Sequence, residues 1–156
     1  MATGELILVM RPDLLLDGPM PVSFSRYYAS MLGREGLASG SAALGKDGKG
    51  ALDNVAEAFK DLKGKNVVVG GYTDDVPTNP KSFPSNWELS TARAIAVVKY
   101  LQSKGVDPVM LAAAGFSEFR PVASNETPEG RRLNRRIEIA LTAADYVPPA
   151  VDAPAR

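Results

Sequence analysis

The sequence predicts an α/β sandwich, in which helices cover a layer of β-strands. Apolar runs typical of strands alternate along the chain with segments whose apolar residues recur every three or four positions. No internal repeat is visible, and 156 residues suit one domain with a proper core. A helix with one apolar stripe must bury that stripe, so the alternation favours helices packed on a single sheet.

The first part of the chain contains one predicted strand and one predicted helix. Residues Glu5 to Met10 form an apolar run typical of a buried strand, which Arg11-Pro12-Asp13 closes. Residues 14–45 give no clear pattern. A helix is predicted from Lys46 to Leu62, with Gly64 as its stop. Its apolar stripe consists of Leu52, Val55, Ala56, Phe59 and Leu62.

The middle of the chain carries the strongest strand and the clearest helix. A β-branched run predicts a strand from Asn66 to Tyr72, and a polar loop with three prolines follows from Thr73 to Asn86. The next helix is predicted over Trp87 to Lys104, with Ser85 or Asn86 as its cap. Its expected core face comprises Leu89, Ala92, Ala96, Val97, Tyr100 and Leu101.

The last part of the chain adds two strands and a short helix. A third strand is predicted over Val109 to Gly115, entered through a turn at Asp107-Pro108. Thr127-Pro128-Glu129 begins a short polar helix, and residues Asn134 to Leu141 alternate as a final strand. The segment 145–156 is rich in Pro and Ala, so we expect a disordered tail after a single domain over 1–144.

Composition excludes several classes of function. Lys plus Arg and Asp plus Glu balance at 18 each, so no global charge directs the chain to nucleic acid or to an acidic membrane. The chain has no Cys, which excludes disulfides and thiolate chemistry. It also has no His, the commonest general base and metal ligand. We therefore expect no metal, no cofactor and no catalysis.

Three charged features are candidates for a ligand site. Asp74 and Asp75 follow a strand, where α/β sheets often bind ligands, and Arg93 lies in the second turn of a helix among core residues. Taken alone, each is more often a solvated side chain. The basic run Arg131 to Arg136 has no interleaved aromatic residue and lies between Glu129 and Glu138, which favours a structural or ligand-lining role over nucleic-acid binding.

Several segments, in order along the chain, resemble the peptidoglycan-binding domain of the OmpA/MotB family. They are Gly71 to Asp75, Ser85 to Ala94, Ala114 to Val122, and Asn125 with Glu129 to Ile139. The loop from Val76 to Ser85 is more similar to the flagellar-stator MotB type than to OmpA itself. The resemblance covers about residues 39–142, with a first strand near residues 5–17.

The resemblance implies a fold and a ligand. The expected fold is an OmpA-like βαβαβ(α)β arrangement, with a mixed four-stranded sheet and helices packed on one face. The expected ligand is the peptidoglycan stem, whose diaminopimelate carries an ammonium and a carboxylate. The resemblance implies that Asp74 binds the ammonium and Arg93 the carboxylate, to which its planar fork can donate two parallel bonds. The other residues expected at this site are Thr73, Asn86, Leu89, Ser90, Asn134, Arg135 and Arg136.

The sequence departs from the family pattern in three places. Tyr72 replaces the usual His, and Asp75 stands where Asn is common. An insertion at about residues 18–37 precedes the first helix. Within it Tyr27 and Met31, with Phe24 one turn earlier, share a helical face, so we expect a short amphipathic segment that packs on this domain or on a partner.

The resemblance also implies a place in the cell. We expect a non-catalytic module in the periplasm that anchors an envelope protein or complex to the cell wall. Attachment to the inner or outer membrane would require segments absent from this chain, and a homodimer stays open. Two alternatives remain: an enzyme acting on the wall, and a protein-protein interaction module that uses the 18–37 insertion.

Overall fold

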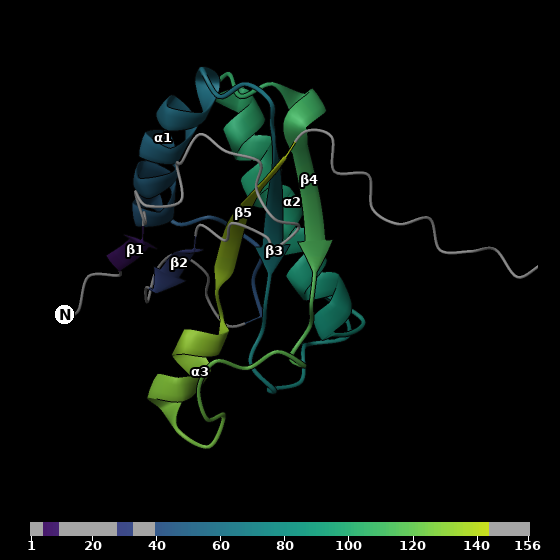
Figure 1. Cartoon of the computed structure of the whole chain (residues 1–156). Coiled ribbons are helices and arrows are strands. Elements are labelled where there is room, and N and C mark those ends of the chain that lie inside the picture. Colours follow the sequence, from purple (N-terminus) through teal and green to yellow (C-terminus); the bar gives the residue numbers. More distant parts are fainter. Residues whose placement is uncertain (1–4, 10–27, 33–39, 144–156) are drawn as a thin grey trace, which may run out of the picture.

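A computed structural model describes residues 5–9, 28–32 and 40–143 of the chain (Figure 1). The predicted domain boundary at 144 and the predicted tail lie outside these ranges. In chain order the elements are β1 (Glu5–Val9), β2 (Tyr28–Leu32), α1 (Lys46–Lys60), β3 (Lys65–Gly71), α2 (Asn86–Ser103), the 3-10 turn η2 (Pro108–Met110), β4 (Leu111–Gly115), α3 (Pro128–Asn134) and β5 (Ile137–Ala143).

Strand β3 is the centre of a three-stranded sheet with the order β4-β3-β5. It pairs in parallel with β4, so α2 serves as the crossover between them (Figure 1). It pairs antiparallel with β5, and Val69 lies between Ala113 of β4 and Ile139 of β5. The ends of β3 and β4 and the start of β5 therefore lie at the same edge of the sheet.

The core lies on one face of this sheet. Val67 and Val69 of β3 face the same side as their β5 partners Leu141 and Ile139, because side chains alternate along a strand. Both long helices pack on this face, as expected, through Leu52 and Val55 of α1 and Val97 and Leu101 of α2. Ala92, Ala96 and Tyr100, expected on the core face of α2, are only half-buried. The buried cluster comprises Leu52, Val55, Ala56, Val67, Val69, Ala94, Val97, Leu101, Val106, Ile137, Ile139 and Leu141.

The four-stranded sheet expected from the resemblance is not confirmed. Residues Glu5–Val9 form a strand, but this strand pairs antiparallel with β2 in a separate two-stranded sheet. The physical reason is that the insertion supplies a strand of equal length, whose register runs from Glu5 opposite Leu32 to Val9 opposite Tyr28. The backbone groups of β1 thus find partners in β2.

The expected helical face across Tyr27 and Met31 is wrong for the part of the insertion that the structure describes. Residues Tyr28–Leu32 form a strand. Over so few residues, apolar spacing cannot separate a helix turn from a strand, and here pairing with β1 decides the conformation. The other residues of the insertion lie outside the described ranges.

Local capping fixes the ends of the shorter elements. The Thr127 hydroxyl accepts from the Gly130 amide and caps α3, with Pro128 in the first turn as predicted. The Asp107 side chain caps η2, which confirms the turn expected before β4. Strand β5 begins three residues later than predicted, because Asn134 still belongs to α3.

No helix in the described ranges is long and apolar enough to cross a bilayer.

Two glycines bring the first turns of α2 directly against the sheet. A Cβ on Gly71 would lie 2.0 Å from the backbone oxygen of Ser90, and a Cβ on Gly115 would lie 2.1 Å from Oγ1 of Thr91. Such distances leave no room for any side chain at either position. The close approach of the helix places Arg93, two turns into α2, beside the end of β3, where its Nη1 donates to the Tyr72 carbonyl.

Candidate functional site

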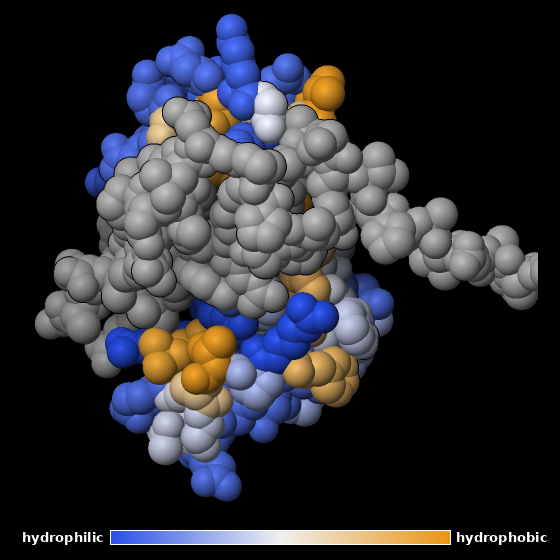
Figure 2. Space-filling view, in the orientation of Figure 1, coloured by the Kyte–Doolittle hydropathy of each residue, from blue (hydrophilic) through white to orange (hydrophobic). Residues whose placement is uncertain are grey.

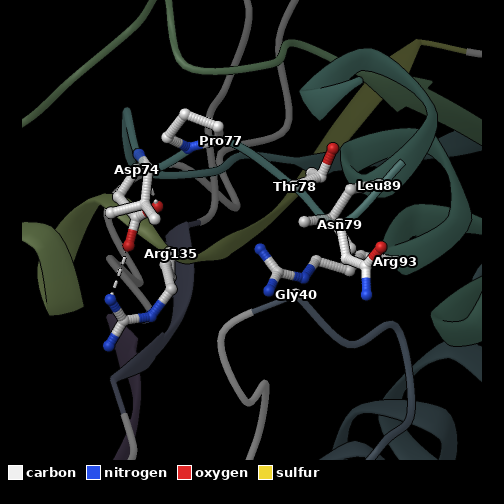
Figure 3. A pocket seen from close by; sticks show the side chains of 9 residues that line it. Gly40, Asp74, Pro77, Thr78, Asn79, Leu89, Arg93 and Arg135 are labelled. Carbon is white, nitrogen blue, oxygen red and sulfur yellow. Dashed lines mark hydrogen bonds and ion pairs between the residues drawn. The ribbon is translucent and has the colours of Figure 1, made fainter. Parts of the chain in front are cut away.

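Three of the charged residues singled out in the sequence lie around one cavity at the shared edge of the sheet (Figure 3). Asp74 follows β3, Arg93 comes from α2, and Arg135 lies between α3 and β5. They border one cavity of about 220 Å³. Its lining consists of Gly40, Asp74, Val76, Pro77, Thr78, Asn79, Leu89, Arg93 and Arg135.

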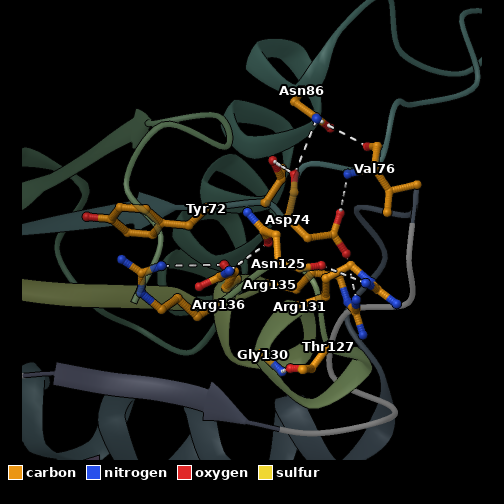
Figure 4. Close-up of polar contacts among 12 residues, drawn as sticks. Tyr72, Asp74, Val76, Asn86, Asn125, Thr127, Gly130, Arg131, Arg135 and Arg136 are labelled. Carbon is orange, nitrogen blue, oxygen red and sulfur yellow. Dashed lines mark hydrogen bonds and ion pairs between the residues drawn. The ribbon is translucent and has the colours of Figure 1, made fainter. Parts of the chain in front are cut away.

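The carboxylate of Asp74 is buried and held by two partners (Figure 4). Its Oδ2 accepts from Nη1 of Arg135 at 2.6 Å, and its Oδ1 accepts from the backbone amide of Val76 at 3.2 Å. The first contact is an ion pair, with side-chain exposures of 5% for Asp74 and 22% for Arg135. The carboxylate is therefore fixed in orientation by Arg135 and the Val76 amide, and it shares the cavity lining with Arg93.

Thr73 and Asn86 shape the backbone around Asp74 and do not line the cavity. The Thr73 hydroxyl donates to the Asp74 carbonyl at 2.8 Å, and its amide donates to the Ser117 carbonyl at 3.0 Å. Nδ2 of Asn86 donates to the carbonyls of Asp74 and Val76 at 3.4 and 3.2 Å (Figure 4). Both side chains thus position the loop that carries the carboxylate.

Arg93 borders the cavity although its residue is 0% exposed. Its Nε donates to the Ser41 carbonyl at 3.0 Å, and its Nη1 donates to the Tyr72 carbonyl at 3.3 Å. Burial lowers the pKa of Arg93 to about 10, and the Asp74 carboxylate opposes this shift. The guanidinium stays charged at neutral pH, so it adds a fixed positive charge to the cavity while it holds two backbone segments together.

Two other predicted site residues serve the surrounding framework. The Ser90 hydroxyl donates to the Trp87 carbonyl at 3.0 Å and accepts from the Ser117 amide at 3.1 Å, which ties α2 to the segment after β4. Asn134 is fully buried and lies outside the cavity lining. Its side-chain amide bonds the amides of Val122 and Ala123, the Ala123 carbonyl and the side chain of Asn125.

Arg136 is directed away from the cavity, in contrast to Arg135. Its guanidinium carbon lies 3.8 Å from the centre of the Tyr72 ring, and its Nε pairs with Glu138 at 2.7 Å. The other face of the Tyr72 ring stacks on Phe116, with 4.8 Å between the centroids. Of the nine residues expected at the site, the structure brings Asp74, Leu89, Arg93 and Arg135 to the cavity and leaves the rest outside its lining.

Sequence reasoning missed the part of the lining that comes from Gly40 and from the loop Val76 to Asn79. The loop's prolines predicted an irregular connection, but loops lack the periodicity that tells which side chain points inward. Val76 is 43% exposed and forms part of the rim. Figure 2 shows hydrophilic side chains over much of the lower end of the molecule, with hydrophobic groups among them.

The chemistry available in the cavity is ionic. One carboxylate and two guanidinium groups face a small space, which suits a polar ligand that carries both signs of charge. Within the ranges that the structure describes, no three acidic side chains gather closely enough to hold a metal ion.

Replacing Tyr72 by Phe tests the buried hydroxyl at the position that departs from the expected family pattern. The Tyr72 hydroxyl donates to Glu138 at 2.9 Å, and burial together with the Glu138 charge raises its pKa to about 12. We expect Tyr72→Phe to lower the free energy of unfolding by about 1 kcal/mol at neutral pH. Because the folded pKa is raised, this contribution is fully present below pH 10 and is lost as the pH rises through 12. Denaturant titrations from pH 8 to 12 measure the free energy of unfolding of both proteins. A stability advantage of the wild type over Tyr72→Phe that grew with pH would contradict the prediction.

Comparisons with known proteins agree with this architecture. A profile described as "OmpA family" matches residues 38–135. The peptidoglycan-binding protein ArfA of Mycobacterium tuberculosis is 36% identical over 112 residues, which cover 67% of this chain and 33% of ArfA. The chain spans half or less of the length of the curated relatives it matches.

Solved structures give the same result. The periplasmic domain of Helicobacter pylori MotB is 32% identical, with a TM-score of 0.63 over 67% of this chain and 73% of that one. The cell wall anchor of the T6SS from Pseudomonas aeruginosa is 38% identical, with a TM-score of 0.68 over 76% of this chain and 82% of that one. The chain belongs to the OmpA family, because the family profile covers more than half of its residues and MotB domains are among its relatives.

Proposed function

We propose that this chain binds peptidoglycan without catalysing a reaction, through the diaminopimelate of the peptide stem. Asp74 binds the ammonium of the diaminopimelate head, and Arg93 binds its carboxylate. The observation that carries this proposal is the presence of both charges in one cavity at the edge of the sheet, with the carboxylate and the guanidinium each buried. Burial strengthens charged hydrogen bonds to a ligand that fills the cavity.

The relatives support this function and suggest its place in the cell. One is named as a peptidoglycan-binding protein, one as a cell wall anchor and one as a periplasmic domain. By analogy, this chain would work in the periplasm and would anchor an envelope protein or complex to the wall. Tethering to the inner or outer membrane by segments outside this chain is part of the same proposal, as is a homodimer.

Purified peptidoglycan sacculi provide the direct test. The protein is mixed with sacculi, the sacculi are sedimented, and both fractions are assayed for the protein and for released reducing ends, amines and shortened stems. We expect retention on the sacculi without new fragments. Fragments that persist after repurification of the protein would overturn the non-catalytic reading, and a protein that stays in the supernatant would overturn peptidoglycan binding.

A second candidate is a protein-protein interaction module that uses the 18–37 insertion. The observation in its favour is that β2 comes from this insertion and builds, with β1, a sheet separate from the one that carries the cavity. Absence of retention on sacculi would favour this alternative.

A further inference from the structure

The carboxylate proposed to bind the ligand's ammonium already has a cationic partner within the chain. Nη1 of Arg135 lies 2.6 Å from Oδ2 of Asp74, the distance of a strong charge-assisted hydrogen bond (Figure 3). An ammonium that bonds this oxygen must therefore displace the guanidinium or share the oxygen with it. The ion pair makes Arg135 an internal competitor for the ligand.

The two arginines of the cavity differ in how firmly they are held. Arg93 is buried and donates to the backbone carbonyls of Ser41 and Tyr72. Arg135 follows the last turn of α3, and its side chain is 22% exposed. Within the described ranges, Asp74 is the carboxylate that pairs with it. Movement of the Arg135 guanidinium therefore breaks its ion pair with Asp74 alone. Movement of the Arg93 guanidinium would break its hydrogen bonds to two backbone carbonyls.

The charges of the cavity lining favour a ligand that brings a carboxylate. Asp74 contributes one negative charge, and Arg93 and Arg135 contribute two positive ones, so the lining has a net charge of +1. A ligand that carries a lone ammonium raises this net charge to +2. A head with an ammonium and a carboxylate adds no net charge.

We propose that Arg135 is the residue that makes the cavity select a head group with an ammonium and a carboxylate on one carbon over a lone ammonium. The ligand's ammonium takes the place of Arg135 on Asp74, and the freed guanidinium joins Arg93 in binding the ligand's carboxylate. This inference rests on the proposed function and extends it to the discrimination between diaminopimelate and lysine stems.

The selectivity follows from what Arg135 gains in each exchange. A lone ammonium would replace one ion pair by another and would leave a partly buried guanidinium without a counter-ion, which is unfavourable. A head with both charges gives the displaced guanidinium a new carboxylate, so that Arg135 keeps an anionic partner and the net charge of the cavity stays at +1. Only the second ligand gains free energy from the exchange.

Two synthetic muramyl tripeptides that differ only in the third residue provide the probes. One carries meso-diaminopimelate, and the other carries lysine, whose side chain ends in an ammonium alone. We expect the wild-type protein to prefer the first by at least about tenfold, the value of one charge-assisted hydrogen bond. In Arg135→Gln the preference should fall to about threefold or less, because Asp74 is then open to the lone ammonium and the lysine peptide binds more tightly than it does to the wild type.

The readouts are calorimetry and the fluorescence of Trp87. This residue is the single tryptophan of the chain and lies next to Asn86, which bonds the Asp74 carbonyl. Arg135→Lys, which keeps a cation able to pair with both carboxylates, should retain most of the preference. Arg120→Gln is the matched control, since it removes an exposed arginine outside the cavity lining and should leave the preference unchanged.

The outcomes separate this inference from the function on which it rests. A wild-type protein that binds neither peptide overturns the proposed function and this inference with it. A wild-type protein that binds both equally, or an Arg135→Gln variant with the wild-type preference, overturns the inference alone. The same holds if Arg135→Gln loses affinity for the diaminopimelate peptide without gaining any for the lysine peptide, because Arg135 would then be a simple carboxylate ligand.

Discussion

Asp74→Asn is expected to weaken retention on sacculi by about ten- to a hundredfold. The substitution keeps the size of the side chain and an oxygen that can accept from the Val76 amide, but it removes the negative charge. Loss of a hydrogen bond to a charged group costs about 1.5–3 kcal/mol, which corresponds to that range of affinities. Sedimentation with increasing amounts of sacculi measures the bound fraction and gives the apparent affinity.

Asp75→Asn is the matched control for this experiment. It makes the same chemical change at the neighbouring position, where the side chain is exposed and does not line the cavity. We expect its retention to stay within about twofold of the wild type, as for a rim charge that contributes little to affinity. Equal loss in both variants would point to general attraction by negative charge, and unchanged retention of Asp74→Asn would refute the assignment of Asp74.

Arg93 is unsuited to the same experiment, although it is the other half of the proposed charge pair. Its side chain is fully buried and bonds the carbonyls of Ser41 and Tyr72. Truncation to Ala would leave a cavity and unpaired carbonyls, and both effects lower the free energy of unfolding. A loss of binding by Arg93→Ala would therefore not separate a ligand contact from a damaged framework.

The elements that sequence reasoning located correctly are those with a local pattern. The strand β3 is a β-branched run, and α1 and α2 carry apolar stripes with the helical period. The order of these elements, together with the parallel pairing of β3 and β4, places Asp74 and Arg93 at one edge of the sheet. Their position in one cavity thus follows from local sequence patterns and from the rule that ligands bind at the carboxyl ends of parallel strands.

The features that the sequence could not predict depend on contacts between distant segments. Pairing of β1 with β2 is a choice between strand partners, which the apolar pattern of either strand does not encode. Arg135 and Arg136 are neighbours in the sequence, yet one pairs with Asp74 and the other covers the Tyr72 ring. A motif identifies both residues but not the direction in which each side chain points.

Asn134 illustrates the same limit for a residue inside a matching motif. The resemblance placed it at the ligand site, whereas its side-chain amide bonds the segment from Val122 to Asn125. A buried side-chain amide with every partner inside the protein has a structural role whether or not it also contacts a ligand. Only the three-dimensional partners of the side chain distinguish the two roles.

Gly71→Ala is expected to produce the largest loss of stability, about 3 kcal/mol or more in the free energy of unfolding. The added Cβ would lie 2.0 Å from the Ser90 backbone oxygen, and a backbone atom of a helix cannot rotate away as a side chain can. Overpacking of a well-packed site costs about 1–3 kcal/mol and occasionally more, and this contact is at the severe end. Denaturant titration should show a lower midpoint with an unchanged slope.

Gly50→Ala is the control that separates steric conflict from the general effect of replacing glycine. Gly50 lies inside α1, and a Cβ there would meet no atom within 4 Å. Alanine favours a helix interior over glycine by about 1 kcal/mol, so this variant should be more stable than the wild type.

Relief of the Gly71 clash requires α2 to move off the sheet, and that movement would carry Leu89 and Arg93 with it. We therefore expect Gly71→Ala to lose retention on sacculi even at temperatures where it remains folded, and normal retention together with a normal midpoint would show that the contact of α2 with β3 does not position the site.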